Sequence, residues 1–237
     1  MEDALFKFKQ FEVFHSKSSM KVGVDAVLLG AWAGEEASKI LDVGCGCGVI
    51  SLMLAQRFPE AEILGIDIDK DSIEEASLNF KNSKWCERLM AHEASFPDDV
   101  SKFGKFDLIV SNPPFFKSGV LSPKTPREKA RHQDLLSIFS LLRNAPEFLL
   151  EQGELAIIYP FEFKEEAYKT AIDSGLSPFR ECLIRGNRRK GVKRIMSAFK
   201  FSNEVNQEPL TTEMTLYDDE SPSRQYLELC KDFYLKF

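Results

Sequence analysis

The sequence predicts an α/β fold in which helices pack against a seven-stranded, mostly parallel sheet with an antiparallel hairpin near the C-terminus. Short β-rich runs alternate with helical patterns along the chain, which is typical of βαβ units. A glycine-rich segment and an Asn-Pro-Pro segment each follow an apolar run directly, as turns do at strand ends. With 43% hydrophobic and 29% charged residues, a chain of 237 residues suits one globular domain with a full core.

The first half of the chain predicts strands and helices in alternation. Residues 40–43 are a short apolar run that ends in glycines, as a buried strand does, and residues 49–58 are apolar almost all round, as in a deeply packed helix. Residues 62–68 predict the second strand. In the helix that follows, we expect Asp71 as the N-cap, with Glu74 completing a capping box. Its expected inner face consists of Ile73, Ala76, Ser77 and Phe80.

The middle of the chain continues the same pattern. Residues 106–111 predict another buried strand, which the Asn-Pro-Pro segment stops. Residues 135–150 have the periodicity of a long amphipathic helix, and Gly153 marks a turn into a strand over 154–159. A helix over 162–174 comes next.

The C-terminal part predicts a hairpin and a closing helix. Two strand-like runs, 179–185 and 192–201, face each other across a basic turn. Apolar residues at helical spacing predict a helix over 224–235, whereas the polar stretch 203–223 has the least regular pattern. The expected core domain covers residues 39–202, with residues 1–38 as an N-terminal extension and residues 203–237 as a C-terminal decoration.

Cysteine usage and hydropathy exclude several classes of protein. The five cysteines are an odd, scattered set, unlike a disulfide framework. Cys45 and Cys47 form a C-x-C pair, but no second pair and no nearby His completes a metal site. No apolar run approaches the ~20 residues of a membrane span, and the N-terminus lacks a secretory signal. We therefore expect a soluble, cytoplasmic protein without a metal or a membrane partner.

Basic residues gather in three segments of an otherwise acidic chain. The net charge is −6, yet residues 7–21, 117–133 and 185–194 together hold 15 basic and 2 acidic residues. Basic loops on an acidic body favour local contact with phosphates, and ordinary solvated loop charges are the alternative. The candidate phosphate contacts are Lys117, Arg127, Arg131, Arg188, Arg189, Lys190 and Lys193.

A D-x-G-x-G-x-G motif runs from Asp42 to Gly48, between a predicted strand and a predicted helix. Glycines let the backbone turn sharply and approach a ligand closely, and the helix N-terminus offers N–H groups and a positive dipole end. Asp67 ends the next predicted strand, where a carboxylate accepts hydrogen bonds from ribose hydroxyls. The motif therefore predicts a nucleoside cofactor site. The spacing differs from the G-x-G-x-x-G of NAD proteins, and a purely structural turn is the other alternative.

A second motif, from Asn112 to Phe115, has the sequence Asn-Pro-Pro-Phe after a predicted buried strand. Two prolines fix the backbone, so the Asn112 side-chain oxygen and the Pro113 carbonyl can each accept one N–H of a planar amino group. This steers the nitrogen lone pair toward a methyl donor, and Phe115 offers a face for base stacking. Catalysis by positioning then needs no strong base before attack. A strand-ending proline turn is the alternative interpretation.

Together these motifs resemble those of amino-group methyltransferases of the class I, S-adenosylmethionine (SAM)-dependent type, which have a Rossmann-like fold. The similarity is closer to the bacterial family that methylates adenine N6 next to the anticodon of a valine tRNA, at position 37. It covers nearly the whole chain. It rests on the two motifs and on the segments MKVGVD (20–25), LLGAW (28–32), PREKAR (126–131) and the aromatic tail 226–235.

The resemblance implies a role for particular residues. Asn112, Pro113, Pro114 and Phe115 would hold the target base, and the basic candidates would hold the tRNA anticodon stem-loop. After the third strand of the expected seven, which ends before Ser95, such enzymes usually have an Asp facing the cofactor adenine; Ser95 stands in that place, with Phe96 beside it. The implied cofactor contacts are Lys21, Asp42, Gly44, Cys45, Gly46, Gly48, Asp67, Ile68, Ser95, Phe96 and Asn112. We expect a monomer that binds neither DNA nor metal.

Three alternatives share these motifs. One is methylation of another amino group in ribosomal RNA, at guanine N2 or adenine N6. A second is methylation of a protein glutamine, although such enzymes carry a large N-terminal domain and only about 38 residues precede the first motif strand here. The third is an RNA-binding protein that binds SAM without activity.

Overall fold

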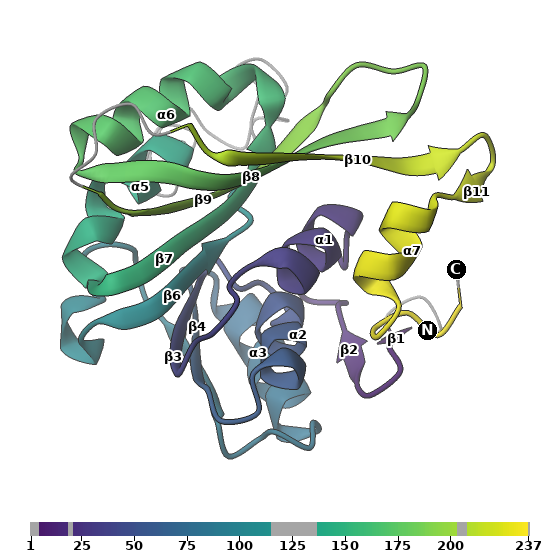
Figure 1. The fold of residues 1–237 in the computed structure, drawn as a ribbon. Coiled ribbons are helices and arrows are strands. Elements are labelled where there is room, and N and C mark those ends of the chain that lie inside the picture. Colours follow the sequence, from purple (N-terminus) through teal and green to yellow (C-terminus); the bar gives the residue numbers. More distant parts are fainter. Residues whose placement is uncertain (1–4, 19–20, 115–136, 203–207, 237) are drawn as a thin grey trace, which may run out of the picture.

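A nine-stranded sheet forms the centre of the molecule, in a computed structural model that describes residues 5–18, 21–114, 137–202 and 208–236 (Figure 1). The strands are β1 (Leu5–Lys7), β2 (Glu12–Phe14), β3 (Lys39–Val43), β4 (Glu62–Asp67), β5 (Leu89–Glu93), β6 (Phe106–Ser111), β7 (Leu149–Pro160), β8 (Leu176–Asn187), β9 (Arg194–Phe201), β10 (Leu210–Asp218) and β11 (Ser221–Pro222). The helices are α1 (Val24–Trp32), α2 (Val49–Arg57), α3 (Lys70–Lys81), α5 (Ile138–Phe148), α6 (Lys164–Asp173) and α7 (Arg224–Cys230), with short 3₁₀ turns η2 (Ser101–Phe103) and η3 (Phe161–Phe163).

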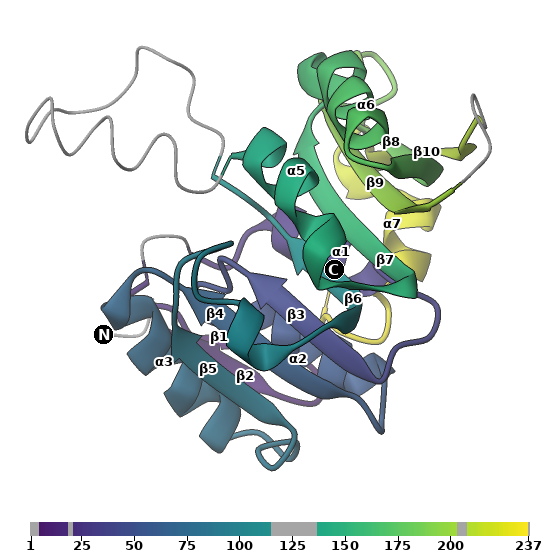
Figure 2. The same ribbon diagram turned by 90° about the vertical axis from the view of Figure 1, so that its left-hand side faces the viewer.

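The strand order is β11-β10-β8-β9-β7-β6-β3-β4-β5, so β5 and β10 lie toward opposite ends of the sheet (Figure 2). β9 runs antiparallel to β7 and β8, and β11 runs antiparallel to β10, whereas the other pairs are parallel. The α/β fold with its hairpin is confirmed. The prediction of seven strands is wrong, because β10 and β11 extend the sheet beyond the hairpin.

Two apolar layers enclose the sheet (Figure 1). One layer holds α1, α2, α3 and α7 together with the β1–β2 pair, and the other holds α5 and α6. The chain ends contribute to the first layer, since Phe8 bridges to Tyr234 and the Lys9 N–H donates to the Phe233 carbonyl at 2.8 Å. Within the described part of the chain, no helix is long and apolar enough to cross a membrane.

Helix α3 differs from its prediction at the N-cap and on its inner face. The cap is Asp69 rather than Asp71, because the Asp69 carboxylate accepts from the Ser72 N–H at 3.1 Å and the helix begins one residue after it. Ser77 is exposed, while Glu75 and Asn79 are buried. Alternation of apolar residues does not reveal these two, because their burial depends on hydrogen bonds to a distant segment.

The C-terminal predictions also need correction. The stretch from 210 to 222 contains β10 and β11, and only residues 203–207 of the irregular stretch lie outside the described ranges. β10 is polar because it lies near the edge of the sheet, and Met214 is its one buried residue. Helix α7 ends at Cys230, earlier than expected, and β7 begins at Leu149, before the predicted turn.

Candidate functional site

A glycine-rich loop joins β3 to α2 at the carboxyl edge of the parallel strands. Gly44, Gly46 and Gly48 have φ values of 71°, 54° and 81°, in the left-handed region that other residues rarely adopt. The N–H groups of Gly44 and Cys45 donate to the Ile66 carbonyl of β4 at 2.8 and 2.9 Å. The sharp turn expected from the glycines is therefore confirmed, and the neighbouring strand fixes it.

The space around two of these glycines differs. A Cβ added to Gly48 would lie 2.4 Å from Cε1 of Phe80, so packing against α3 requires a glycine there. A Cβ added to Gly46 would meet no atom of the described residues within 4 Å. The backbone at Gly46 thus borders an open cradle that a ligand can approach closely.

Asp67 ends β4 beside this cradle. Its Oδ2 accepts from the Gly46 N–H at 3.0 Å and its Oδ1 accepts from the Asp69 N–H at 3.0 Å. Burial raises the pKa of Asp67, and these backbone bonds oppose the rise. The next residue, Ile68, is 43% exposed. The Asp67 carboxylate therefore lies at the cradle, and an exposed apolar residue follows it directly in the chain.

Asp42 lies beneath the loop rather than in the cradle. It is fully buried, and its Oδ2 accepts from the N–H and the hydroxyl of Ser51 at 3.1 and 2.7 Å. Burial raises the pKa of Asp42 to about 7, and its Oδ1 has no partner among the described residues. Asp42 thus joins β3 to α2 and positions the loop, and the direct cofactor contact that the resemblance implies stays a prediction.

Ser95 and Phe96 follow β5 on the same side of the sheet. The Ser95 N–H donates to Asp99 Oδ2 at 2.9 Å, and the residue is half-buried. The Phe96 ring is 4% exposed and packs edge-to-face on Phe148, with 5.6 Å between ring centroids. Phe96 therefore belongs mainly to the core, and little of its ring is left to contact a cofactor.

Asn112 follows β6 directly and points its amide oxygen into a buried place without a partner. Its Oδ1 accepts no hydrogen bond from the described residues, although buried polar atoms are normally paired. The preceding Ser111 donates its hydroxyl to the Val43 carbonyl at 2.7 Å, which ties the ends of β6 and β3 together. Pro113 is buried and Pro114 half-buried. Phe115 lies outside the described residues, as do Lys117, Arg127 and Arg131.

The segment before α1 reaches the same edge of the sheet. Lys21 is exposed, and the N–H of Val22 donates to Nδ1 of His15 at 3.3 Å. Asp25, in the first turn of α1, forms an ion pair with Arg194 at 2.9 Å. Since Arg194 begins β9, this pair joins the N-terminal segment to the hairpin.

The basic turn between β8 and β9 carries the four described candidates for phosphate contact. Arg188 forms an ion pair with Asp218 at 2.7 Å, and Arg189 lies 3.9 Å from Asp219. Lys190 is exposed, and Lys193 donates its N–H to the Ile184 carbonyl at 2.9 Å. The turn is thus held at the surface by acidic residues of the β10–β11 turn.

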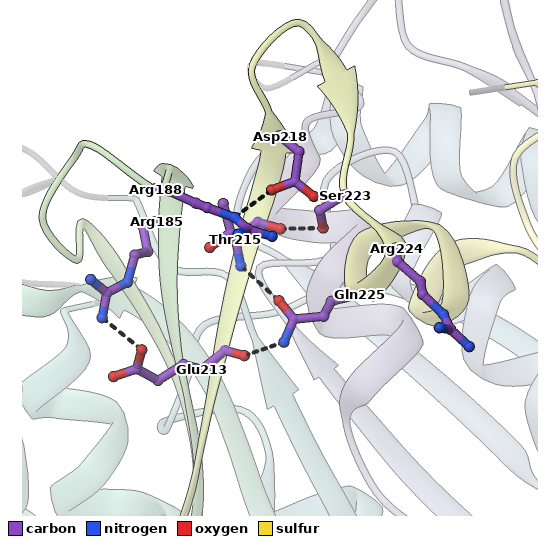
Figure 3. Close-up of a pocket in the computed structure, with 8 residues that line it drawn as sticks. All are labelled: Arg185, Arg188, Glu213, Thr215, Asp218, Ser223, Arg224 and Gln225. Carbon is purple, nitrogen blue, oxygen red and sulfur yellow. Dashed lines mark hydrogen bonds and ion pairs between the residues drawn. The ribbon is translucent and has the colours of Figure 1, made fainter.

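A polar groove of about 400 Å³ adjoins this turn (Figure 3). Three arginines come to it from different places, Arg185 from β8, Arg188 from the turn and Arg224 from the start of α7. Glu213 pairs with Arg185 at 2.7 Å. Sequence reasoning missed this groove, because one wall comes from β10 and α7, in and beside a stretch without a regular pattern.

The described residues contain no group of three or more His, Cys, Asp or Glu arranged to hold a metal ion. Cys45 and Cys47 are both buried as free thiols, and burial raises the pKa of each.

Comparison with known proteins identifies close relatives of the whole chain. The model of the methyltransferase small domain family matches residues 7–181. The tRNA1(Val) (adenine(37)-N6)-methyltransferase of Parabacteroides distasonis is 39% identical over 239 residues, covering 100% of both chains. The protein of the same name from Vibrio campbellii is 36% identical over 235 residues, covering 98% of this chain and 95% of its own.

Solved structures with lower identity show the same fold. A predicted O-methyltransferase from Agrobacterium tumefaciens is 18% identical with a TM-score of 0.64, and the match covers 88% of this chain and 96% of that one. A methyltransferase from Pyrococcus furiosus is 20% identical with a TM-score of 0.56, covering 80% and 88%. At these identities the likeness supports the fold alone.

Proposed function

The chain belongs to the tRNA1(Val) (adenine(37)-N6)-methyltransferase family, and from this premise we propose that it methylates N6 of adenine 37 in a valine tRNA with SAM as the donor. The observation that carries the proposal is the buried Oδ1 of Asn112, which has no hydrogen-bond partner among the described residues. This oxygen can accept a hydrogen bond, and an amino group of the substrate supplies the donor.

The cradle fits the cofactor of this family. SAM, when bound, supplies an electrophilic methyl group on a sulfonium. The open space at Gly46 admits a close approach to the backbone, and the Asp67 carboxylate at its rim suits a ribose diol. Ile68 offers apolar surface to the adenine, and Ser95 offers one hydroxyl where an Asp is usual, which predicts weaker adenine binding.

Asn112 performs the chemistry by positioning the amine. Its Oδ1 accepts one N–H of the adenine amino group, and the carbonyl of Pro113 accepts the other. So held, the amine would present its nitrogen lone pair to the methyl group of SAM; the methyl–sulfur bond would break as the methyl–nitrogen bond forms, leaving a neutral thioether, and the proton would pass to water after the transfer. Phe115, by its type and place in the sequence, is the stacking partner of the base.

The basic turn leaves the sheet at the edge where Asn112 lies. β6 ends at Ser111, one residue before Asn112, and runs parallel to β7. β7 ends at Pro160, which pairs with Arg194 of the antiparallel β9. The turn 188–193 therefore projects beyond the same edge, and with strands about 4.8 Å apart β8 lies about 14 Å from β6. That separation suits contact with the stem phosphates while the loop base reaches Asn112.

A base in the anticodon loop is already single-stranded, so inserting it into a pocket needs less energy than flipping it from a duplex. Asn112 and the basic turn come from one chain, so the proposal requires only a monomer. A tRNA substrate implies that the enzyme works in the cytoplasm.

The test is methyl transfer from labelled SAM to tRNA that lacks the modification, followed by mass spectrometry of the digested nucleosides. We expect N6-methyladenosine in the valine tRNA at position 37. Label in ribosomal RNA or in protein glutamine, with none in tRNA, would contradict the proposed substrate but keep the cofactor. SAM binding without any transfer would point to an inactive RNA-binding protein.

A further inference from the structure

Glu75 of α3 is a buried carboxylate that binds three successive backbone N–H groups of the N-terminal segment. Only 3% of the residue is exposed. Oε1 accepts from the N–H of Ser16 at 2.6 Å and of Lys17 at 2.8 Å, and Oε2 accepts from the N–H of Ser18 at 2.9 Å. Hydrogen bonds to an ionised group are roughly twice as strong as neutral ones, so this contact fixes the path of the segment.

Asn79 lies one turn further along α3 and is 1% exposed. Its Oδ1 accepts from the N–H of Phe14 at 2.9 Å. Its Nδ2 donates to the carbonyl of Phe14 and to the carbonyl of Cys47, both at 2.8 Å. One buried amide therefore ties the N-terminal segment and the glycine-rich loop to the same helix.

The second contact of Asn79 lies directly beside the cradle. Cys47 follows Gly46, the glycine with open space above it, and precedes Gly48, which packs on the Phe80 ring of α3. The loop is thus attached to α3 at the Cys47 carbonyl and at Gly48. A change in the position of this carbonyl moves the backbone at Gly46, where the cofactor would lie.

The charge of Glu75 is maintained despite its burial. Burial raises the pKa of Glu75, but the backbone hydrogen bonds from Lys17, Ser18 and Ser16 outweigh it and leave that pKa below its ordinary value. The carboxylate is therefore ionised at neutral pH and acts only as an acceptor, which matches the three donors that face it.

We propose that Glu75 and Asn79 are positioning residues for the cofactor site, which hold residues 14–18 against the glycine-rich loop and so set the geometry of the cradle at Gly46. The inference rests on the proposed function in that the cradle binds SAM. Neither residue borders the open space itself, and neither belongs to the sequence motifs.

The experiment compares SAM affinity with stability in three variants. Glu75→Ala leaves three backbone donors without their partner, and we expect its SAM Kd to rise on the order of tenfold. In Glu75→Gln one oxygen remains as an acceptor while the amide nitrogen faces a donor, so a smaller rise is expected. The matched control is Glu74→Ala, one residue away, which removes only the exposed ion pair of Glu74 with Lys17 at 3.0 Å and should leave the SAM Kd unchanged.

The measurements are the SAM Kd by calorimetry, at a temperature where circular dichroism shows each variant folded, and the methylation rate at saturating SAM. A positioning role predicts a raised KM for SAM with kcat within about twofold of wild type. An unchanged SAM Kd in folded Glu75→Ala, or in Glu75→Gln if the alanine variant does not fold, would overturn the inference. Failure of the wild type to bind SAM would instead contradict the proposed function.

Discussion

The cradle at Gly46, which we propose as the cofactor site, and the basic turn lie at one edge of the same sheet, yet their polar groups are held in opposite ways. Around the cradle, Asp42, Glu75 and Asn79 are at most 3% exposed and bind backbone N–H or carbonyl groups. In the turn, the side chains of Arg188 and Arg189 are 80% and 90% exposed and face acidic side chains. A buried group that loses its partner costs about 1–3 kcal/mol, whereas an exposed ion pair contributes about 0–1 kcal/mol.

This difference explains what each region can do. A cradle built on buried backbone contacts is preformed, so it can orient a small cofactor without rearrangement. A turn built on exposed charges binds by summed attraction, which tolerates variation in a nucleic-acid backbone and weakens with salt. Substitutions near the cradle and Asn112 should therefore change stability, SAM affinity or kcat strongly. Substitutions at the turn should change tRNA binding only modestly and in a salt-dependent way.

The largest effect is expected for Asn112→Ala. Removing Oδ1 removes the acceptor that we propose aims the amine, so kcat should fall by about 10³. The SAM Kd should stay within about threefold of wild type. The measurement is single-turnover methylation of the tRNA beside calorimetry of SAM. Asn144→Ala on α5, where the amide only donates to the Ser140 carbonyl at 2.8 Å, is the matched control. Full activity of Asn112→Ala would break the proposed mechanism.

The sequence predicts the cradle and Asn112 better than it predicts their supports. Positive φ at Gly46 and the strand end before Asn112 are local properties, and local residue types encode them. The support from Glu75 and Asn79 is non-local, because each binds a segment about 60 residues away in the chain. In the sequence both residues look like the solvent face of a helix, so periodicity alone assigns them to the surface.

Strands β10 and β11, which extend the sheet, were not predicted from the sequence for a different reason. β10 is polar on most positions, since it lies near the edge of the sheet and buries only Met214. A strand that is held mainly by backbone pairing to β8 carries little hydrophobic signal. For the same reason the acidic partners of the basic turn, Asp218 and Asp219, could not be anticipated from the local pattern.

The next largest effects are expected for alanine substitutions at two glycines of the loop. One substitution should mainly reduce stability and the other should mainly weaken SAM binding. Gly48→Ala forces a Cβ to 2.4 Å from the Phe80 ring, so the free energy of unfolding should fall by about 3 kcal/mol. Gly46→Ala meets open space and should lose only about 1 kcal/mol, from backbone strain. In the cradle, however, its methyl group occupies cofactor space, so the SAM Kd should rise by more than about tenfold. Urea unfolding and calorimetry on both variants separate the two effects, and equal losses of stability would contradict the packing difference.

The pH dependence of stability tests whether the polar groups around the cradle are buried, with Asp42 as the example. Burial raises the pKa of Asp42 to about 7 from an ordinary value of 3.8, so the folded chain binds more protons than the unfolded chain between these pH values. The contribution of Asp42 to stability is therefore lost as pH rises from about 4 to 7. The Asp42→Asn side chain does not ionise, so the variant does not lose stability in this way as pH rises.

The free energy of unfolding of Asp42→Asn relative to wild type should accordingly increase by about 2 kcal/mol between pH 5 and pH 8. Urea unfolding of both proteins at several pH values gives this difference directly. The effect of carboxylates that do not interact with Asp42 cancels, because both proteins contain them. A difference that does not vary with pH would mean that Asp42 titrates as an exposed carboxylate does, against its burial.

The smallest effect on activity is expected at the exposed basic turn, for the double variant Arg188→Ala with Arg189→Ala. Loss of the two proposed phosphate contacts should raise the KM for tRNA by about three- to tenfold and reduce the slope of log KM against log salt by about 2. The SAM Kd and the melting temperature should stay at wild-type values, since both side chains are exposed. Lys102→Ala with Lys105→Ala removes the same charge before β6, at the opposite edge of the sheet, and should leave the salt slope unchanged. If both double variants change the slope equally, the turn acts only through net charge, and the RNA contact must lie elsewhere on the edge beside Asn112.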